Sequence, residues 1–74
     1  MVFPNPTKGE VVITGLPNSE QKILNITNIN GSVLQTIKVE GVRASVDLST
    51  LNKGIYFLKI SDRTSQRIFK VVKN

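Results

Sequence analysis

The side chains that could do acid–base, nucleophilic or metal chemistry are few in this chain and lie far apart. There is no histidine and no cysteine, so the usual general base, the thiol nucleophile and the soft metal ligands are missing. The five carboxylates are scattered rather than paired as an acid and a base would be: Glu10, Glu20, Glu40, Asp47 and Asp62. Tight metal binding would need a cluster of such groups. The sequence therefore predicts no enzyme, no cofactor and no metal site.

The positive charge of the chain is concentrated near its end. The 74 residues carry a formal net charge of +5, and the charges in residues 1–52 cancel. Residues 53–74 contain one carboxylate, Asp62, and six cationic residues: Lys53, Lys59, Arg63, Arg67, Lys70 and Lys73. A basic segment and a pI of about 10.0 raise the question of a nucleic-acid partner. Without interleaved exposed aromatic residues, a modest positive field is weak support for one, and no nucleic-acid partner is predicted.

The last apolar segment has two distinct faces. Phe69 and Val71 alternate with Ile68, Lys70 and Val72. If the first pair faces a core, the other three form an apolar and cationic stripe outside it. The unpaired backbone groups of such a strand can take up another strand, which would make it a docking edge. A solvated strand whose lysines deter aggregation is the alternative.

A polar turn leads into the strand that precedes this segment. Asp47 and the hydroxyl residues that follow it can accept hydrogen bonds from nearby backbone N–H groups. We expect Leu48 and Leu51 to close one end of a β-sandwich, and Gly54 to take a positive φ where the next strand begins. The cluster is therefore interpreted as architecture rather than as a carboxylate site.

Short antiparallel strands are the elements that must position these side chains. Apolar residues recur at period two between turn residues spaced about 8 to 12 residues apart, and no segment has sustained helical periodicity. Asn30-Gly31 predicts a hairpin, because this pair tolerates positive φ at both central turn positions. A second turn is expected at Leu16-Pro17-Asn18-Ser19. The predicted strands are Glu10 to Thr14, Lys22 to Asn28, Ser32 to Val39, Arg43 to Asp47, Ile55 to Ser61 and Gln66 to Lys73.

Alternation along these strands predicts which side chains form the core. These residues are expected to face inward: Leu24, Ile26, Val33, Ile37, Val39, Tyr56, Leu58 and Ile60. The fold class is thus all-β, a small antiparallel β-sandwich of about six or seven short strands in one domain. A chain this short buries only roughly 60% of its unfolded surface and has no disulfide, so apolar packing must hold it together.

Targeting segments are not evident in the sequence. No apolar run approaches the ~20 residues of a membrane-spanning helix, so stable membrane insertion is not predicted. Pro4, Asn5 and Pro6 interrupt the position where the apolar stretch of a signal peptide would lie. If the parent protein is exported, its leader is therefore expected on a preceding segment.

Several short motifs, taken in order, resemble a known family. They are Phe3-Pro4-Asn5-Pro6, Gly31 in the central hairpin, Asp47-Leu48-Ser49 with Leu51, Gly54-Ile55-Tyr56-Phe57, and the closing Arg67 to Lys73. Together they resemble the type A C-terminal sorting domain of the bacterial type IX secretion system, and the likeness extends over almost the whole chain. Two departures are Gln66-Arg67, where many relatives have threonine and lysine, and the terminal Asn74.

The resemblance implies an Ig-like β-sandwich at the C-terminus of a cargo protein, with residues 1–74 as its single sorting domain. Such domains are read by an outer-membrane translocon after the cargo reaches the periplasm. A surface protease of the sortase kind then removes the domain and can join the cargo to lipopolysaccharide. The implied partners are thus the translocon, its shuttle and this protease, and the implied destination is the outer-membrane surface or the medium.

On this basis one group of residues is expected to be recognised and another to be structural. An adhesive or carbohydrate-binding module remains the alternative function, although such sites present aromatic platforms and the chain has only four aromatic residues. The isolated domain could also dimerise through an exposed edge strand. The recognition candidates are Lys59, Arg63, Arg67, Ile68, Lys70, Val72, Lys73 and Asn74. The structural motif comprises Pro4, Asn5, Pro6, Asn30, Gly31, Asp47, Leu48, Leu51, Gly54 and Tyr56.

Overall fold

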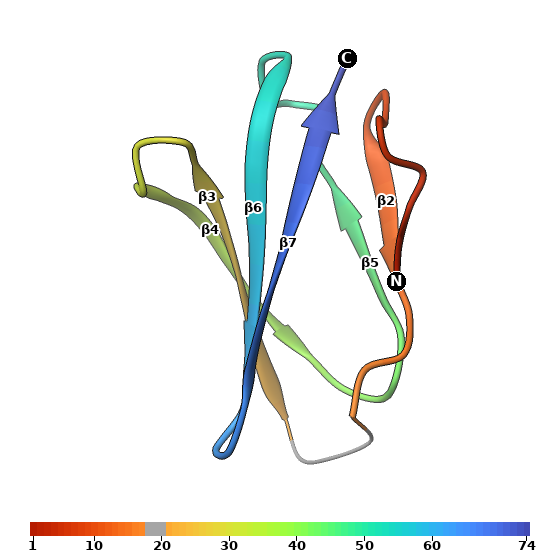
Figure 1. Ribbon diagram of the computed structural model, residues 1–74, viewed down its shortest axis with the longest axis vertical. Coiled ribbons are helices and arrows are strands. Elements are labelled where there is room, and N and C mark those ends of the chain that lie inside the picture. The colour runs from red at the N-terminus through yellow and green to blue at the C-terminus, as the bar shows by residue number, and fades with distance from the viewer. Residues whose placement is uncertain (18–20) are drawn as a thin grey trace.

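Two antiparallel β-sheets face each other in the computed structural model, which describes residues 1–17 and 21–74 (Figure 1). One sheet has the strand order β1-β2-β5 and the other the order β4-β3-β6-β7. The described residues contain no helix, so the predicted all-β sandwich is confirmed. The strands are β1 (Val2–Phe3), β2 (Glu10–Ile13), β3 (Lys22–Asn28), β4 (Val33–Val39), β5 (Ala44–Asp47), β6 (Gly54–Ser61) and β7 (Gln66–Lys73).

The strand bounds agree with the alternation pattern to within one residue at each end. Only β1 was not predicted, because two residues are too short to show a period of two. Part of one predicted turn, Asn18-Ser19, lies outside the described residues, as does Glu20. The chain passes between the two sheets from β2 to β3, from β4 to β5 and from β5 to β6 (Figure 1).

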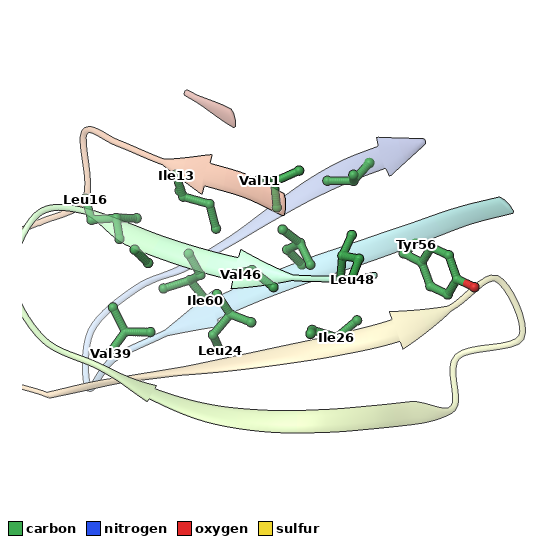
Figure 2. Close-up of a cluster of buried hydrophobic side chains, with 13 residues drawn as sticks. Val11, Ile13, Leu16, Leu24, Ile26, Val39, Val46, Leu48, Tyr56 and Ile60 are labelled. Atoms are coloured by element: carbon green, nitrogen blue, oxygen red, sulfur yellow. The ribbon is translucent and has the colours of Figure 1, made fainter. Parts of the chain in front are cut away.

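The core lies between the two sheets and is built from side chains of both. Figure 2 shows Val11, Ile13 and Val46 of the smaller sheet directed toward residues of the larger one. The predicted inward faces of β3 and β6 are confirmed, since their alternate residues are buried. The buried apolar residues are Val11, Ile13, Leu16, Leu24, Ile26, Val39, Ala44, Val46, Leu48, Tyr56, Leu58, Ile60 and Val71.

The inner face of β3 also carries a charged residue. Lys22 is only 1% exposed and lies opposite Val39 of β4. Its Nζ donates a hydrogen bond of 2.9 Å to the backbone carbonyl of Pro17. A buried ammonium group needs such partners, so this contact compensates part of its lost hydration and ties the loop after β2 to β3.

The hairpin between β3 and β4 forms as predicted, but with a three-residue loop. Gly31 has a φ of +86°, whereas Asn30 has no positive φ. The N–H of Gly31 donates to the carbonyl of Asn28, and the N–H of Asn28 donates to the carbonyl of Ser32. A left-handed glycine that closes a three-residue loop is a common alternative to the two-residue turn that Asn-Gly predicts. The Asn28 side chain adds bonds to the N–H groups of Asn30 and Ser32, which favours the longer loop.

A bulge beside this hairpin overturns one predicted core position. Val33 is 56% exposed, although its spacing from Ile37 and Val39 predicts an inward side chain. The register between β3 and β4 shifts after Ile26, so Val33 lies opposite the outward-facing Thr27. A bulge of this kind moves a residue to the other face of the sheet. Ile37 packs against the core and Val39 is buried, as predicted.

A buried tyrosine fixes the entry to β6. Tyr56 is 8% exposed, and its Oη donates a hydrogen bond of 2.5 Å to the backbone carbonyl of Asn52. A tyrosine near the start of a strand that bonds back to the preceding loop is a feature of Ig-type sandwiches. The Tyr56 ring is thus buried while its hydroxyl group still has a partner (Figure 2).

Candidate recognition site on the last two strands

Strand β7 pairs with β6 along its whole length, from Gln66 opposite Ser61 to Lys73 opposite Gly54. Val71 is fully buried, and Phe69 packs against the core from a half-buried position. Ile68 and Lys70 are exposed, and Val72 is half-buried. The two predicted faces of this strand are therefore present.

The outer edge of β7 is covered by the segment that precedes β2. The Asn5 side chain donates from Nδ2 to the carbonyl of Lys70 and accepts from the N–H of Val72, both at 2.9 Å. One amide side chain thus satisfies a backbone acceptor and a backbone donor, much as a neighbouring strand would. Docking of another strand onto this part of β7, one interpretation of its sequence, does not agree with this pairing.

Thr7 extends the same cover toward the end of the chain. Its N–H donates to the carbonyl of Val72 and its carbonyl accepts from the N–H of Asn74, each at 2.8 Å. The Thr7 side chain is 2% exposed, donates to the carbonyl of Glu10 at 2.7 Å and accepts from the N–H of Gly9 at 3.0 Å. Thr7 therefore links β7 to the smaller sheet, and no local sequence pattern predicts this role.

Two of the predicted recognition cations bind backbone carbonyls at the ends of the sandwich. Arg67 lies on the inner side of β7, opposite Ile60, and its Nη1 donates to the carbonyl of Gly15 at 3.0 Å. Lys73 donates from Nζ to the carbonyl of Ser49 at 3.3 Å and to that of Leu51. Both side chains connect the last strand to loops of the other sheet, so their first role is structural.

The remaining candidates on β7 form an outward-facing surface together with β6. Ile68 lies opposite Lys59, Lys70 opposite Phe57, and Val72 opposite Ile55. We define the outer patch as these six residues: Ile55, Phe57, Lys59, Ile68, Lys70 and Val72. Ile68 is 58% and Ile55 38% exposed.

Sequence reasoning identified four of these six side chains and omitted Ile55 and Phe57. Ile55 and Phe57 are spaced two residues apart from each other and from Lys59 along β6, so their side chains lie on the same face. Applying the alternation argument to that strand would have identified them. None of the described residues at outward positions of β3, β6 and β7 is a carboxylate. The outer patch therefore combines apolar surface with positive charge that no carboxylate among the described residues of these strand faces balances.

The other two predicted recognition residues lie away from the outer patch. Arg63 is in the turn between β6 and β7, where Asp62 Oδ1 accepts from the N–H groups of Thr64 and Ser65. Asn74 follows β7 and is held by its backbone bond to Thr7. The structure thus divides the eight predicted residues between one face, two sandwich ends and a turn.

The polar turn after β5 has the structural role that its sequence predicts. Asp47 Oδ1 accepts a hydrogen bond of 2.8 Å from the N–H of Ser49. Hydrogen bonding from the Ser49 side chain, together with this backbone bond, lowers the pKa of the exposed Asp47 carboxyl, and the nearby Lys73 adds to the effect. Leu48 is fully buried, Leu51 packs against the core, and Gly54 has a φ of +156°. The turn therefore closes this end of the sandwich.

The described residues were compared with the requirements of a metal site and of a membrane-spanning helix. Across residues 1–17 and 21–74, no three His, Cys, Asp or Glu side chains are grouped closely enough to hold a metal ion. Within the same residues no helix is long and apolar enough to cross a membrane.

Comparison with known protein families identifies a match over the whole chain. The family model described as the secretion system C-terminal sorting domain matches residues 1–74, which is the whole chain. No curated protein sequence matches significantly.

Proposed function

Because the chain belongs to the family of type IX secretion C-terminal sorting domains, we propose that it is the sorting signal of a larger cargo protein and is recognised through its outer patch. Domains of this family are non-catalytic sorting signals that direct export through the type IX system to the cell surface or the medium. We further propose an export route for the cargo and the component that recognises the domain. The cargo crosses the periplasm, and the outer-membrane translocon or its shuttle binds the folded sandwich.

We choose the outer patch as the recognised surface because it combines exposed apolar side chains with lysines. Among residues 1–17 and 21–74, no hydrogen bond or ion pair engages the ammonium groups of its lysines, Lys59 and Lys70, whereas Arg67 and Lys73 bind carbonyls. Ile68, the most exposed apolar residue of the patch, neighbours both lysines: it lies opposite Lys59 on β6 and two residues from Lys70 along β7. Exposed apolar side chains with interspersed like charges fit a partner surface that carries carboxylates beside apolar groups.

Presentation of the patch depends on the N-terminal segment. Asn5 and Thr7 hold the edge of β7, and the strand in turn positions Ile68, Lys70 and Val72. A pre-organised surface costs little conformational entropy on binding. The aromatic-Pro-Asn-Pro motif would thus serve recognition indirectly, by fixing the strand that is read.

After translocation, we propose that a surface protease of the sortase kind removes the domain. The cargo is then either joined to anionic lipopolysaccharide or released. The compact sandwich favours a cleavage site upstream of Val2, since the strands and loops of the described residues are tied into the two sheets.

The test of the sorting function is a fusion of a Sec leader, a fluorescent reporter and this domain in a type IX-competent bacterium. We expect reporter at the surface or in the medium, and its loss in a translocon-null strain. Retention in the periplasm of both strains would contradict the sorting function.

The test of the outer patch uses point variants rather than truncation. Deleting residues 67–74 would remove the fully buried Val71 and most pairs with β6, so lost export would report unfolding. The double variant Lys59→Glu/Lys70→Glu keeps the core and should trap the reporter in the periplasm. Lys8→Glu/Lys53→Glu changes the net charge equally at exposed positions outside the patch and should be exported. Normal export of the first variant, with its fold intact, would contradict recognition at the patch while leaving the sorting function standing.

A further inference from the structure

Strand β4 is an open edge of the larger sheet. It pairs with β3 on one side, and within the described residues no strand lies on its other side. Its seven residues contain no proline, and Lys38 is its only charged residue. Proteins usually protect such edges with prolines, inward-pointing charges or a covering segment, because unpaired backbone groups can bind another strand.

The other three sheet edges are short or covered. Asn5 and Thr7 bind the backbone of β7 between Lys70 and Asn74. Strand β1 has two residues, and β5 has four and ends at the charged Asp47. Among the described strands, β4 is therefore the longest edge without a cover.

Side chains along β4 add apolar surface to this edge. Val33 and Leu34 are exposed, and Ile37 is half-buried against the core. The bulge after Ile26 distorts the end at Val33, so the regular part of the strand is Gln35–Val39. A β-branched, nearly uncharged segment of this kind favours strand pairing.

We propose that β4 pairs antiparallel with β4 of a second copy of this chain, with the two-fold axis at Ile37. This register pairs the whole regular segment Gln35–Val39 with itself. It places Ile37 opposite Ile37 and Gln35 opposite Val39 on the inner face. On the outer face Thr36 of each copy lies opposite Lys38 of the other. The two larger sheets become one continuous eight-stranded sheet.

Alternative registers are less favourable. An axis at Thr36 leaves three regular residues paired and puts the bulged end opposite Val39. An axis at Lys38 places like charges directly opposite each other, which is destabilising. A slip by one residue would oppose inward and outward side chains.

Charge variants on the outer face test the proposed pairing. We expect the 74-residue chain, of 8.2 kDa, to sediment as a dimer at high concentration. Thr36→Lys would put two lysine pairs opposite each other in the dimer and should weaken dimerisation about tenfold or more. Adding Lys38→Glu converts both into opposite-charge pairs and should restore the dimer, whereas Thr36→Val should dimerise like the unmodified chain.

A thiol probe tests the position of the axis. The chain has no cysteine, so each single-cysteine variant carries one thiol. Residues directly opposite in a sheet have Cβ atoms about 4.5–5.5 Å apart, near the reach of a disulfide. Ile37→Cys should therefore form covalent dimers on mild oxidation, and Ile55→Cys, in the outer patch, should not.

Two outcomes would overturn the proposal. One is a monomer at all concentrations up to ~1 mM, which would leave the edge to a strand of a different protein. The other is a dimer that is insensitive to Thr36→Lys and is not trapped by Ile37→Cys, which would place the interface elsewhere.

Discussion

Asn5 and Val72 lie 67 residues apart in the sequence, and the Asn5 side-chain carbonyl accepts a hydrogen bond of 2.9 Å from the Val72 N–H. The amide group of the same side chain donates to the carbonyl of Lys70. Asn5 therefore completes the backbone pairing of β7 at an edge where a further strand would otherwise be needed.

Replacing Asn5 with alanine removes both bonds and leaves two backbone groups of β7 to water. We expect Asn5→Ala to lower the free energy of unfolding by about 1–3 kcal/mol, measured by urea denaturation. Asn5→Asp keeps an acceptor for Val72 but loses the donor to Lys70, and should fall between the two. Hydrogen exchange at the Val72 amide should accelerate in Asn5→Ala. Unchanged exchange there would contradict the role assigned to Asn5.

Thr7 offers a second test of the link between β7 and the smaller sheet. Its hydroxyl is buried and bonds to Glu10 and Gly9. Thr7→Val keeps the shape but removes both bonds, and should cost about 1–3 kcal/mol in the free energy of unfolding. Thr7→Ser keeps the hydroxyl and should lose less. Equal effects of the two substitutions would show that the hydroxyl bonds do not stabilise the domain.

Period-two alternation is enough to predict the strands, the faces of β3, β6 and β7 and the class of the fold. It depends only on which side chains can be buried, which is a local property. The misplaced Val33 shows the limit of this reasoning, because a bulge reverses the faces and has no signature in composition. The missed β1 shows another limit, because two residues have no period.

The candidate site was less predictable than the fold. Net charge grouped Arg67 and Lys73 with Lys59 and Lys70, but a charge count cannot distinguish a cation that binds a carbonyl from one that faces solvent. The pairing of Asn5 and Thr7 with β7 is set by tertiary contacts between distant segments. The Pro-Asn-Pro motif could be matched to a family, yet its contacts could not be derived from its letters.

Core and surface residues of the last hairpin should respond very differently to substitution by alanine. Leu58 of β6 is fully buried, whereas Ile68 of β7 is 58% exposed. Leu58→Ala should cost about 2–5 kcal/mol, a large share of the roughly 4–11 kcal/mol expected for a domain of this size. Ile68→Ala should cost less than about 1 kcal/mol. Thermal unfolding followed by circular dichroism measures both.

The comparison also separates stability from recognition. Since Ile68 belongs to the outer patch, Ile68→Ala should reduce export of the reporter fusion while the midpoint of unfolding hardly moves. Loss of stability as large as that of Leu58→Ala would instead place Ile68 in the packing of the domain.

The hydroxyl of Tyr56 provides a test of the loop between β5 and β6. Tyr56→Phe keeps the buried ring and removes the hydrogen bond to the carbonyl of Asn52. We expect the free energy of unfolding to fall by about 0.5–1.5 kcal/mol. Tyr56→Leu also removes ring packing and should cost more. A Tyr56→Phe variant as stable as the parent would mean that water replaces the bond at no cost.

Acid should weaken the turn after β5 through Asp47. Hydrogen bonding from the Ser49 side chain and from the Ser49 N–H, with the nearby Lys73, holds the pKa of Asp47 below its ordinary value of 3.8. A carboxyl whose pKa is lower in the folded state stabilises the fold above its unfolded pKa and loses that contribution as pH falls through the folded pKa. We therefore expect the urea midpoint of the parent to be flat near neutral pH and to fall below about pH 4.

Two substitutions isolate this contribution. Asp47→Asn keeps an acceptor for Ser49 without the charge, so its stability should vary less with pH and approach that of the parent in acid. Asp47→Ala removes the acceptor and should be less stable than Asp47→Asn throughout, because Ser49 then lacks its partner at every pH. If the gap between the parent and Asp47→Asn stayed constant from pH 7 to about pH 2, charge at Asp47 would have no part in the acid sensitivity, and the other carboxylates would have to account for it.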